Sequence, residues 1–350
     1  MNISGTDRGA RTTVFTPRID DLLRTHRGAD AFRLDPGTVG VAGPELIDEI
    51  LRSRPANEFE RPTFKPLKGR SITRPESSAL MRAVSQDVKV ALKKTDPEKV
   101  DLSGEWPQVG HAYLRDLVFG SDPRRYRVLM DRRLEWTTAM TWTVIGTGAA
   151  LPGSPGPGAP VSRLAALTAE AGTYAERRHA MGMYRRAAAP VCFTVSTLVA
   201  NALWLGSPFG DDVSNRDILL ETLRLLPPSW NLLRVASPEF AALDERIGER
   251  DDVLMLPLLT HRSPTIWEDP DTFRPDRWAG ADPDDHPGYL PFGHANERCW
   301  GRHMVMPLAE RLLDLLRAGD FAVDPDQTSA RVPLAGLLGV TGVRVARRQR

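Results

Sequence analysis

A chain of 350 residues with 41% hydrophobic and 26% charged residues is typical of a globular protein with one large domain or two small ones. This composition excludes a disordered or fibrous chain. The 46 basic and 45 acidic residues leave a net charge of +1, so the charge balance does not favour nucleic acid or an anionic membrane as a partner. We therefore expect no nucleic-acid or membrane partner, and we expect the chain to be a monomer.

The two cysteines, Cys192 and Cys299, are too few for a disulfide framework and fit a reducing cytoplasm. Residues 1–13 are polar and lack the apolar core of a signal peptide, so we expect them to form a disordered N-terminus. The most apolar window, residues 191–205, is shorter than the roughly twenty apolar residues that a membrane span needs. These features predict a cytoplasmic protein.

In chain order, residues 32–41 predict two short strands around a Pro-Gly turn, and residues 44–52 predict a helix. Residues 76–94 have apolar side chains at helical spacing. Another helix is expected at about 107–119, with Gly120 as its C-cap.

The segment 151–160 contains four prolines and three glycines, which exclude a helix or a central strand. It predicts a surface connection, with a domain boundary as the less favoured alternative. A helical stretch follows at 161–189, and Pro190 is expected to kink or restart it before the apolar helix 191–205.

The next predicted helix, residues 217–226, ends at Pro227 and Pro228. Short strands and loops are expected from there to Trp278, and a final amphipathic helix at 301–318. The predicted fold class is therefore mainly α with small β-sheets.

The segment 291–301 is a glycine-containing loop that brings Cys299 to the start of a helix. A thiolate at a helix N-terminus meets unpaired backbone N–H groups and the positive end of the helix dipole. Gly301 allows the backbone to pass close to a flat ligand, and Phe292 can lie beside the sulfur. The alternative is a buried structural cysteine at a helix start.

This segment resembles the haem-binding loop of the cytochrome P450 family, F-x-x-G-x-x-x-C-x-G, at Phe292, Cys299 and Gly301. Glu221-Thr-Leu-Arg224 resembles that family's E-x-x-R helix, and residues 273–277 resemble its F-x-P-x-R segment, which ends at Arg277. Residues 34–44 and 100–120 resemble further parts of the family. The three motifs occur in the family's order and spacing.

The resemblance implies a single triangular helical domain over residues 1–350, with a haem b whose iron is held by the thiolate of Cys299. It implies a structural role for Glu221, Arg224 and Arg277, which hold the core that carries the cysteine loop. A glutamate and an arginine one helical turn apart face the same side, and a second arginine can complete a charge-assisted network.

The haem propionates need cationic donors. Arg234 lies where the family places a propionate-binding arginine, and Arg82 matches the arginine of its W/H-x-x-x-R helix motif. Either arginine is alternatively a solvated surface residue. Phe292, Arg298 and Gly301 complete the expected haem-binding set.

Three positions depart from the haem-binding motifs. Ser78 replaces the Trp or His of the helix motif, Ala295 replaces a loop glycine, and Glu297 replaces a propionate-binding cation. A carboxylate repels a propionate, so we expect Glu297 to turn away and Arg298 to substitute for it.

The distal helix departs as well. The family carries an acid beside an alcohol there, whereas Thr194 and Thr197 follow no acid. They are the candidate catalytic residues, through a distal water, unless their hydroxyls only satisfy the preceding helical turn. Cys192 either lines this pocket or is a small buried hydrophobic residue.

The leading hypothesis is a haem-thiolate monooxygenase that acts on a small natural-product-like substrate, with a ferredoxin and a ferredoxin reductase as external electron donors. The alternative is a non-hydroxylating reaction, such as oxidative cyclisation, coupling, rearrangement or peroxide-dependent chemistry, because the distal acid is absent. A third hypothesis is a non-catalytic binding module, against which the retained motifs argue. The substrate pocket is expected at residues 64–73, 191–201, 232–235 and 334–340.

Overall fold

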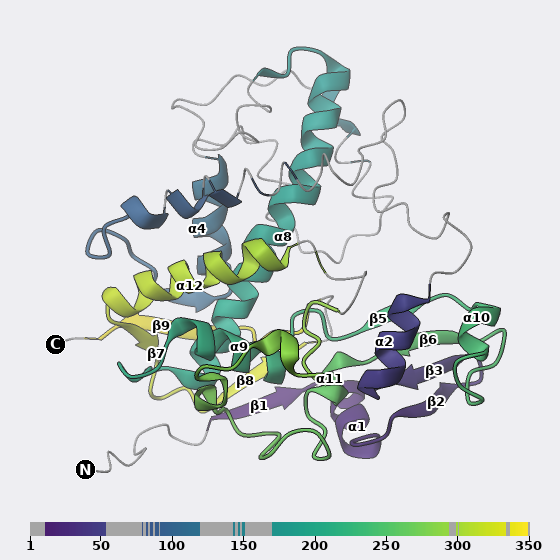
Figure 1. The fold of residues 1–350 in the computed structure, drawn as a ribbon. Helices are drawn as coiled ribbons and strands as arrows, with labels where there is room; N and C mark the ends of the chain where they lie inside the picture. Colours follow the sequence, from purple (N-terminus) through teal and green to yellow (C-terminus); the bar gives the residue numbers. More distant parts are fainter. Residues whose placement is uncertain are drawn as a thin grey trace, which may run out of the picture. The chain divides into compact units, whose positions relative to one another are not determined.

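The structure is a computed structural model of the chain, and it describes residues 11–53, 79, 82, 85–86, 88–90, 92–119, 143, 146–147, 149–150, 170–293, 299, 301–333 and 337–348 (Figure 1). The chain divides into two compact units. Unit 1 comprises Met1–Glu60, Ala200–Arg302 and Pro325–Gly342, and unit 2 comprises Arg61–Val199, His303–Asp324 and Val343–Arg350.

Unit 1 is built on a four-stranded sheet with the order β2-β3-β6-β5. The predicted strands around the Pro-Gly turn are confirmed as the antiparallel hairpin β2 (Ala31–Asp35) and β3 (Thr38–Val41). Strand β3 runs parallel to β6 (Asp252–Met255), and β6 pairs antiparallel with β5 (Leu232–Arg234).

Helix α2 (Pro44–Arg52), also predicted, contributes apolar residues to the core of this sheet. Its amphipathic pattern buries Leu46, Ile47, Ile50 and Leu51 in one cluster with the strands. Leu290, which precedes the predicted cysteine loop, belongs to the same cluster. The residue immediately before the cysteine loop is therefore anchored in the buried core of the sheet.

The described part of unit 1 also contains four short helices, three of which lie at or before Trp278, where only strands and loops were expected. These are α10 (Pro238–Ala241), α11 (Pro257–Thr260), and the 3-10 helices η2 (Pro275–Trp278) and η3 (Pro283–Asp285). Each begins with proline, whose fixed φ suits the first helical turn. Pro257 and Pro275, which lie in the stretch that was expected to hold strands and loops, each start a short helix.

Unit 1 also contains a helix and a pair of strands near the start of the described chain. Helix α1 spans Pro17–Thr25, and β1 (Thr12–Phe15) pairs in parallel with β8 (Ser329–Val332). Thr12 and Thr13, expected in a disordered N-terminus, thus lie in a strand, and Trp204 Nε1 donates a hydrogen bond to Thr13 Oγ1 at 3.0 Å.

Unit 2 contains a three-stranded sheet with the order β4-β9-β7. Its strands are β4 (Gly104–Trp106), β7 (Phe321–Val323) and β9 (Val343–Arg347). The predicted helices α4 (Gln108–Phe119) and α12 (Arg302–Ala318) are confirmed, and α12 buries an apolar stripe that includes Leu308, Leu312 and Leu316. The described residues of 79–94 are helical, with Val88 and Leu92 buried.

Helix α8 (Tyr174–Gly206) differs from its prediction at both points where a boundary was expected. It begins at Tyr174 because Thr173 and Glu176 form a capping box, in which Thr173 Oγ1 accepts the Glu176 N–H and Glu176 Oε2 accepts the Thr173 N–H. The helix then continues through Pro190 without restarting.

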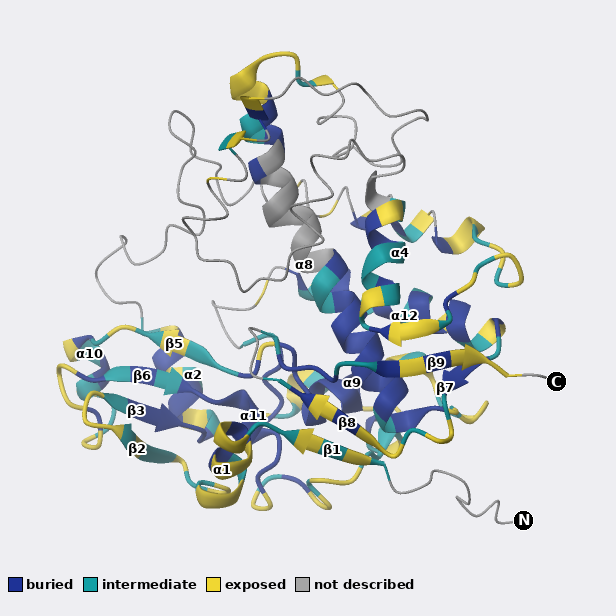
Figure 2. Ribbon diagram, turned by 180° about the vertical axis from the view of Figure 1, so that it is seen from behind, coloured by how far each residue is buried: buried dark blue, intermediate teal, exposed yellow. Residues whose placement is uncertain are grey.

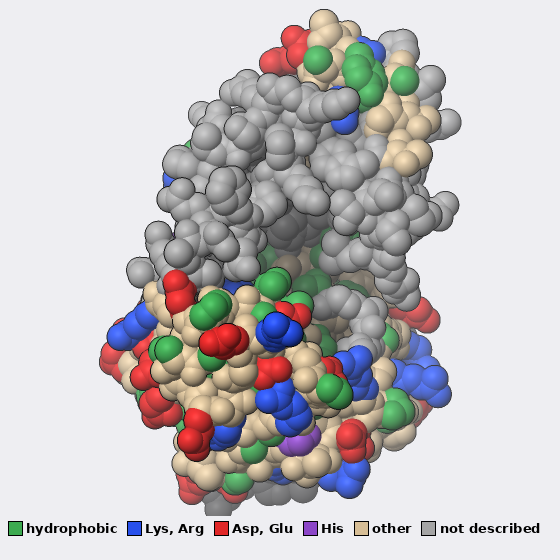
Figure 3. Space-filling model, turned by 90° about the vertical axis from the view of Figure 1, so that its right-hand side faces the viewer, with side chains coloured by type: hydrophobic (Ala, Val, Ile, Leu, Met, Phe, Trp, Pro, Cys, Tyr) green, Lys and Arg blue, Asp and Glu red, His purple; other side chains and the backbone are tan. Residues whose placement is uncertain are grey.

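The fold is thus mainly α with small β-sheets, as predicted. Figure 2 shows the C-terminal part of α8 and much of α9 (Asn215–Leu225) as buried. Figure 3 shows acidic and basic side chains interspersed on one face of the described surface, in line with the near-neutral net charge. Among the described residues, no helix is both long and apolar enough to cross a bilayer.

Candidate functional site

Helix α9 of unit 1 carries a buried ion pair. Helix α9 begins at the N-cap Ser214, whose hydroxyl accepts the Asp217 N–H. One helical turn apart, Glu221 and Arg224 are both fully buried. Arg224 donates through Nε and Nη2 to the two carboxylate oxygens of Glu221, at 3.0 and 2.7 Å. This bidentate geometry is the strongest form of a carboxylate–guanidinium contact.

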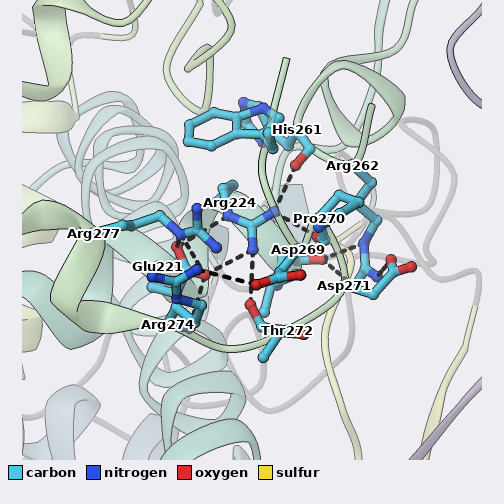
Figure 4. A network of polar contacts seen from close by, with 12 residues as sticks. Glu221, Arg224, His261, Arg262, Asp269, Pro270, Asp271, Thr272, Arg274 and Arg277 are labelled. Carbon is cyan, nitrogen blue, oxygen red and sulfur yellow. Dashed lines mark hydrogen bonds and ion pairs between the residues drawn. The ribbon is translucent and has the colours of Figure 1, made fainter. Parts of the chain in front are cut away.

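The segment around η2 closes the other side of the Glu221 carboxylate, as Figure 4 shows. Arg277 Nε donates to Glu221 Oε1 at 3.2 Å, and the backbone N–H of Arg274 donates to the same oxygen at 3.0 Å. Trp278 Nε1 donates to Oε2 at 2.9 Å. The structure therefore brings together Glu221, Arg224 and Arg277, and it adds two donors that the motifs did not indicate.

Arg224 has its own set of acceptors on the far side. Its Nη1 donates to the carbonyls of His261 and Pro270, at 2.8 and 2.6 Å, and its Nη2 donates to the carbonyl of Thr272 at 3.1 Å. The guanidinium also lies over the Trp267 ring, 5.2 Å from its centroid. Burial of this pair without such partners would be strongly unfavourable. We call these groups the charge network.

Arg262 extends the charge network to the end of α9. It donates from Nε and Nη2 to the carbonyl of Leu225, at 3.2 and 2.8 Å, and pairs with Asp271 at 2.9 Å. Burial, which disfavours the charged form, lowers the pKa of Arg262 to about 10. The Leu225 carbonyl at the end of α9 is thus bound by a cation that stays charged at neutral pH.

The cysteine segment, residues 289–301, leads from this network to α12. The N–H of Cys299 donates to the carbonyl of Phe292 at 2.7 Å, and the carbonyl of Cys299 accepts the N–H of Arg302 at 3.3 Å. Cys299 is exposed, Phe292 is half-buried and Gly301 is buried. Residues Arg298, Ala295 and Glu297 lie outside the described residues. The main chain therefore presents an exposed thiol next to the first turn of α12.

Arg234, the expected propionate ligand, lies on the edge strand β5 of the same unit. It is half-buried, and its Nη1 donates to the carbonyl of Leu233 at 3.1 Å. Its neighbours Leu233 and Val235 are 54% and 57% exposed, which is unusual for large apolar side chains. This edge combines a cation with exposed apolar surface.

The distal candidates Thr194 and Thr197 belong to unit 2, on α8. Thr197 is buried and Thr194 is half-buried. Between them, the Ser196 hydroxyl donates to the carbonyls of Cys192 and Phe193, at 2.5 and 3.2 Å. Cys192 is fully buried, which raises the pKa of its thiol.

The remaining candidate, Arg82, is helical and exposed in unit 2. Ser78, four residues before it, lies outside the described residues. The structure thus groups Glu221, Arg224, Arg277, Arg234, Phe292, Cys299 and Gly301 in unit 1, whereas Arg82, Thr194 and Thr197 are in unit 2.

Comparisons with known proteins agree with this architecture. Residues 216–329, which contain the charge network and the cysteine segment, match the family model of cytochrome P450. Cyclooctatin synthase of Streptomyces melanosporofaciens is 36% identical over 86 residues, which is 24% of this chain and 19% of that protein. The chain thus spans only about a fifth of the length of this curated relative.

Solved structures match over nearly the whole chain. A six-coordinated cytochrome P450 from Thermus thermophilus superposes with a TM-score of 0.54 and 16% identity, over 95% of this chain and 99% of that one. HmtT, involved in himastatin biosynthesis, superposes with a TM-score of 0.57 and 16% identity, over 93% and 96% of the two chains. The chain has the cytochrome P450 fold, and the resemblance that its motifs indicated is confirmed.

Proposed function

We propose that the chain is a haem-thiolate oxidative enzyme of the monooxygenase type, with Cys299 as the axial ligand of a haem b. The observation that carries this proposal is the exposed thiol of Cys299, presented at the start of α12 by the hydrogen bond between its N–H and the Phe292 carbonyl. A thiol that had only a packing role would be buried, as Cys192 is.

The residues present fit a haem. A thiolate is a soft ligand for iron, and Arg234 supplies a cation of the kind that a propionate needs. The exposed apolar side chains beside Arg234, Leu233 and Val235, are suited to contact a flat apolar macrocycle or a nonpolar substrate. Arg82 and Arg298 are the further propionate candidates, and Phe292 and Gly301 would lie against the macrocycle.

A bound haem supplies activation of oxygen at iron, which a thiolate ligand promotes by donating electron density. The chain's own residues have separate tasks. Cys299 would hold the metal, and the charge network of Glu221, Arg224 and Arg277 would keep the main chain around the cysteine segment in place. Thr194 and Thr197 are the candidates for holding a proton-donating water on α8.

We further propose that the substrate is a small natural product with considerable nonpolar surface. Two of the similar proteins have names tied to natural products, cyclooctatin and himastatin. The electron donors proposed are a ferredoxin and a ferredoxin reductase, and the enzyme is proposed to act as a cytoplasmic monomer with one functional domain.

One observation favours a second candidate reaction. Thr194 and Thr197 follow no acidic residue, and the Ser196 hydroxyl between them donates to backbone carbonyls. General acid assistance contributes about 10²- to 10⁴-fold to a proton-dependent step. Its loss favours oxidative cyclisation, coupling, rearrangement or a peroxide-dependent reaction over simple hydroxylation.

The ligand assignment is tested by the absorption spectrum of the reduced protein with carbon monoxide. The wild type and Cys192→Ser are expected to give the red-shifted Soret band of thiolate ligation, whereas Cys299→Ser is expected to lose it. A wild-type spectrum without that band would overturn the proposal. Incorporation of labelled molecular oxygen into product then distinguishes monooxygenation from coupling, and turnover with peroxide alone identifies the peroxide-dependent alternative.

A further inference from the structure

His261 contacts both the charge network and the cysteine segment. We propose that His261 is a positioning residue for Cys299, whose imidazole fixes the main chain at Leu290 and thereby the Phe292 carbonyl that holds the Cys299 N–H. The inference rests on the proposed role of Cys299 as the iron ligand.

The main chain of His261 is tied to the charge network. Its carbonyl accepts a hydrogen bond from Arg224 Nη1 at 2.8 Å, which Figure 4 shows, and its N–H donates to the carbonyl of Pro257 across α11. The side chain is fully buried and stacks on Tyr289, with 5.6 Å between ring centroids. These contacts restrict the orientation of the imidazole ring.

The imidazole holds the start of the cysteine segment. Nε2 of His261 accepts the backbone N–H of Leu290 at 2.8 Å. The neighbouring Tyr289 donates its hydroxyl hydrogen to the carbonyl of Leu220 on α9, at 3.0 Å. Two consecutive residues are therefore fixed to the core immediately before the segment leaves it.

Hydrogen bonds of the main chain connect Leu290 to Gly293, and Phe292 to Cys299. The carbonyl of Leu290 accepts the N–H of Gly293 at 3.1 Å, which closes a turn around Phe292. The carbonyl of Phe292, at the centre of that turn, accepts the N–H of Cys299 at 2.7 Å. Hydrogen bonds thus connect Arg224, His261, Leu290 and Cys299 without a break other than the turn itself.

Packing alone does not account for a histidine at this position. Because Nε2 is the acceptor, Nδ1 carries the hydrogen, and among the described residues the nearby backbone carbonyls of Leu223 and Arg224 do not complete a hydrogen bond of good geometry with it. A buried donor without a partner is unfavourable, and an apolar side chain would avoid it. The feature of the imidazole that explains a histidine here is therefore Nε2, which accepts the hydrogen bond from Leu290.

The surroundings keep that acceptor available. Burial, followed by the charge of Arg224, lowers the pKa of His261 to about 3, so the ring stays neutral near neutral pH. His286 acts in the same direction, and only the backbone carbonyls of Leu223 and Arg224 favour protonation. Arg224 thus holds the carbonyl of His261 and disfavours a second proton on its ring.

The test compares His261→Leu, which removes the acceptor, with His261→Gln, whose amide oxygen can accept the Leu290 N–H. Backbone hydrogen exchange of the full chain is followed by mass spectrometry. In His261→Leu, exchange is expected to rise about tenfold at both Leu290 and Cys299, the factor for loss of one buried hydrogen bond. Exchange between β3 and β6 is expected to stay unchanged, and His261→Gln is expected to restore protection.

Two outcomes would overturn the proposal. One is unchanged exchange at Cys299 in His261→Leu, and the other is an equal rise throughout unit 1, which indicates a packing role. If His261→Leu does not fold, His261→Asn, whose side chain is too short to reach Leu290, replaces it. In the haem-loaded protein, His261→Leu is expected to lose the thiolate-type carbon monoxide band faster than wild type on warming below the unfolding transition.

The spectrum of the wild type separates this proposal from the proposed function. A wild type without a thiolate-type band would refute the role of Cys299 as iron ligand, while the exchange comparison would still decide whether His261 restrains the Cys299 backbone.

Discussion

Replacing Glu221 by glutamine tests whether the charge network stabilises unit 1 as its geometry indicates. The substitution preserves the size and shape of the side chain but replaces one carboxylate oxygen by an NH₂ group. Glu221 is fully buried, so water cannot compensate for a donor that loses its acceptor. The change therefore isolates the charge and the second acceptor.

The expected loss follows from the donors around each oxygen. Oε1 accepts from Arg224 Nη2, Arg274 N and Arg277 Nε, and Oε2 accepts from Arg224 Nε and Trp278 Nε1. In either orientation of the amide, its NH₂ group faces at least two of these donors. Removing one charge of a buried pair costs about 3–5 kcal/mol. That is a large part of the roughly 5–15 kcal/mol that stabilises a typical domain.

Urea unfolding followed by tryptophan fluorescence measures the effect, because Trp267 and Trp278 lie in the network. Glu268→Gln is the matched control, since that side chain is 82% exposed in its pair with Arg274 and is expected to change stability by less than about 0.5 kcal/mol. A loss below about 1 kcal/mol for Glu221→Gln would refute the reasoning, because the buried arginine would then not need its carboxylate.

Three further predictions concern other parts of the molecule. Asn201→Leu removes three buried hydrogen bonds to main-chain groups and is expected to lower the free energy of unfolding by about 3 kcal/mol in urea titrations; an unchanged midpoint would contradict this. Folding lowers the pKa of His261 from 6.5 to about 3, so below pH 6.5 the unfolded chain binds a proton that the folded chain does not. The free energy of unfolding is therefore unaffected by this group above pH 6.5, and it falls by up to about 1.4 kcal/mol per pH unit as the pH drops towards 3. Wild type should therefore lose more stability in acid than His261→Gln does, and parallel curves would refute the assignment. In the native full chain without haem, Cys299 is expected to react with Ellman's reagent, whereas Cys192, whose pKa is raised by burial, is expected to react only after unfolding; one native thiol titrating in Cys299→Ser would contradict this.

The helices with strong apolar periodicity and clear boundaries could be predicted from the sequence. Residues 44–52 carry Pro44 at the start and four buried apolar residues, and the structure has the helix at the same positions. The end of α12 before Gly319 was equally clear. Local signals of this kind do not depend on distant contacts.

The start of α8 could have been predicted but was not. Thr173 and Glu176 have the spacing of a capping box, yet the prediction ran one helical stretch across them, from residue 161 to 189. At Pro190 the expected restart of the helix was wrong, because α8 continues from Tyr174 to Gly206 and the local rule for proline does not by itself decide where a long helix ends.

Within the candidate site, the motifs predicted Glu221, Arg224 and Arg277 but not their other partners. Trp278 and the backbone of Arg274 bind Glu221 because η2 curls over the carboxylate, and no local pattern encodes that approach. His261 was missed for the same reason, since its partner Leu290 follows almost thirty positions later in the chain. Contacts between loops depend on the finished fold.

The chain path of unit 1 has a consequence for how the protein folds. Strand β1 pairs with β8, so Thr12 meets Ser329 from close to the opposite end of the described chain. The closing strands of the two units, β8 and β9, are also neighbours in sequence. The two-stranded sheet of unit 1 and the three-stranded sheet of unit 2 each join a strand from the first third of the chain to a strand from its last part, and such long-range pairing is expected to make folding slow. A single stop codon before β8 would therefore leave both units unfinished at once.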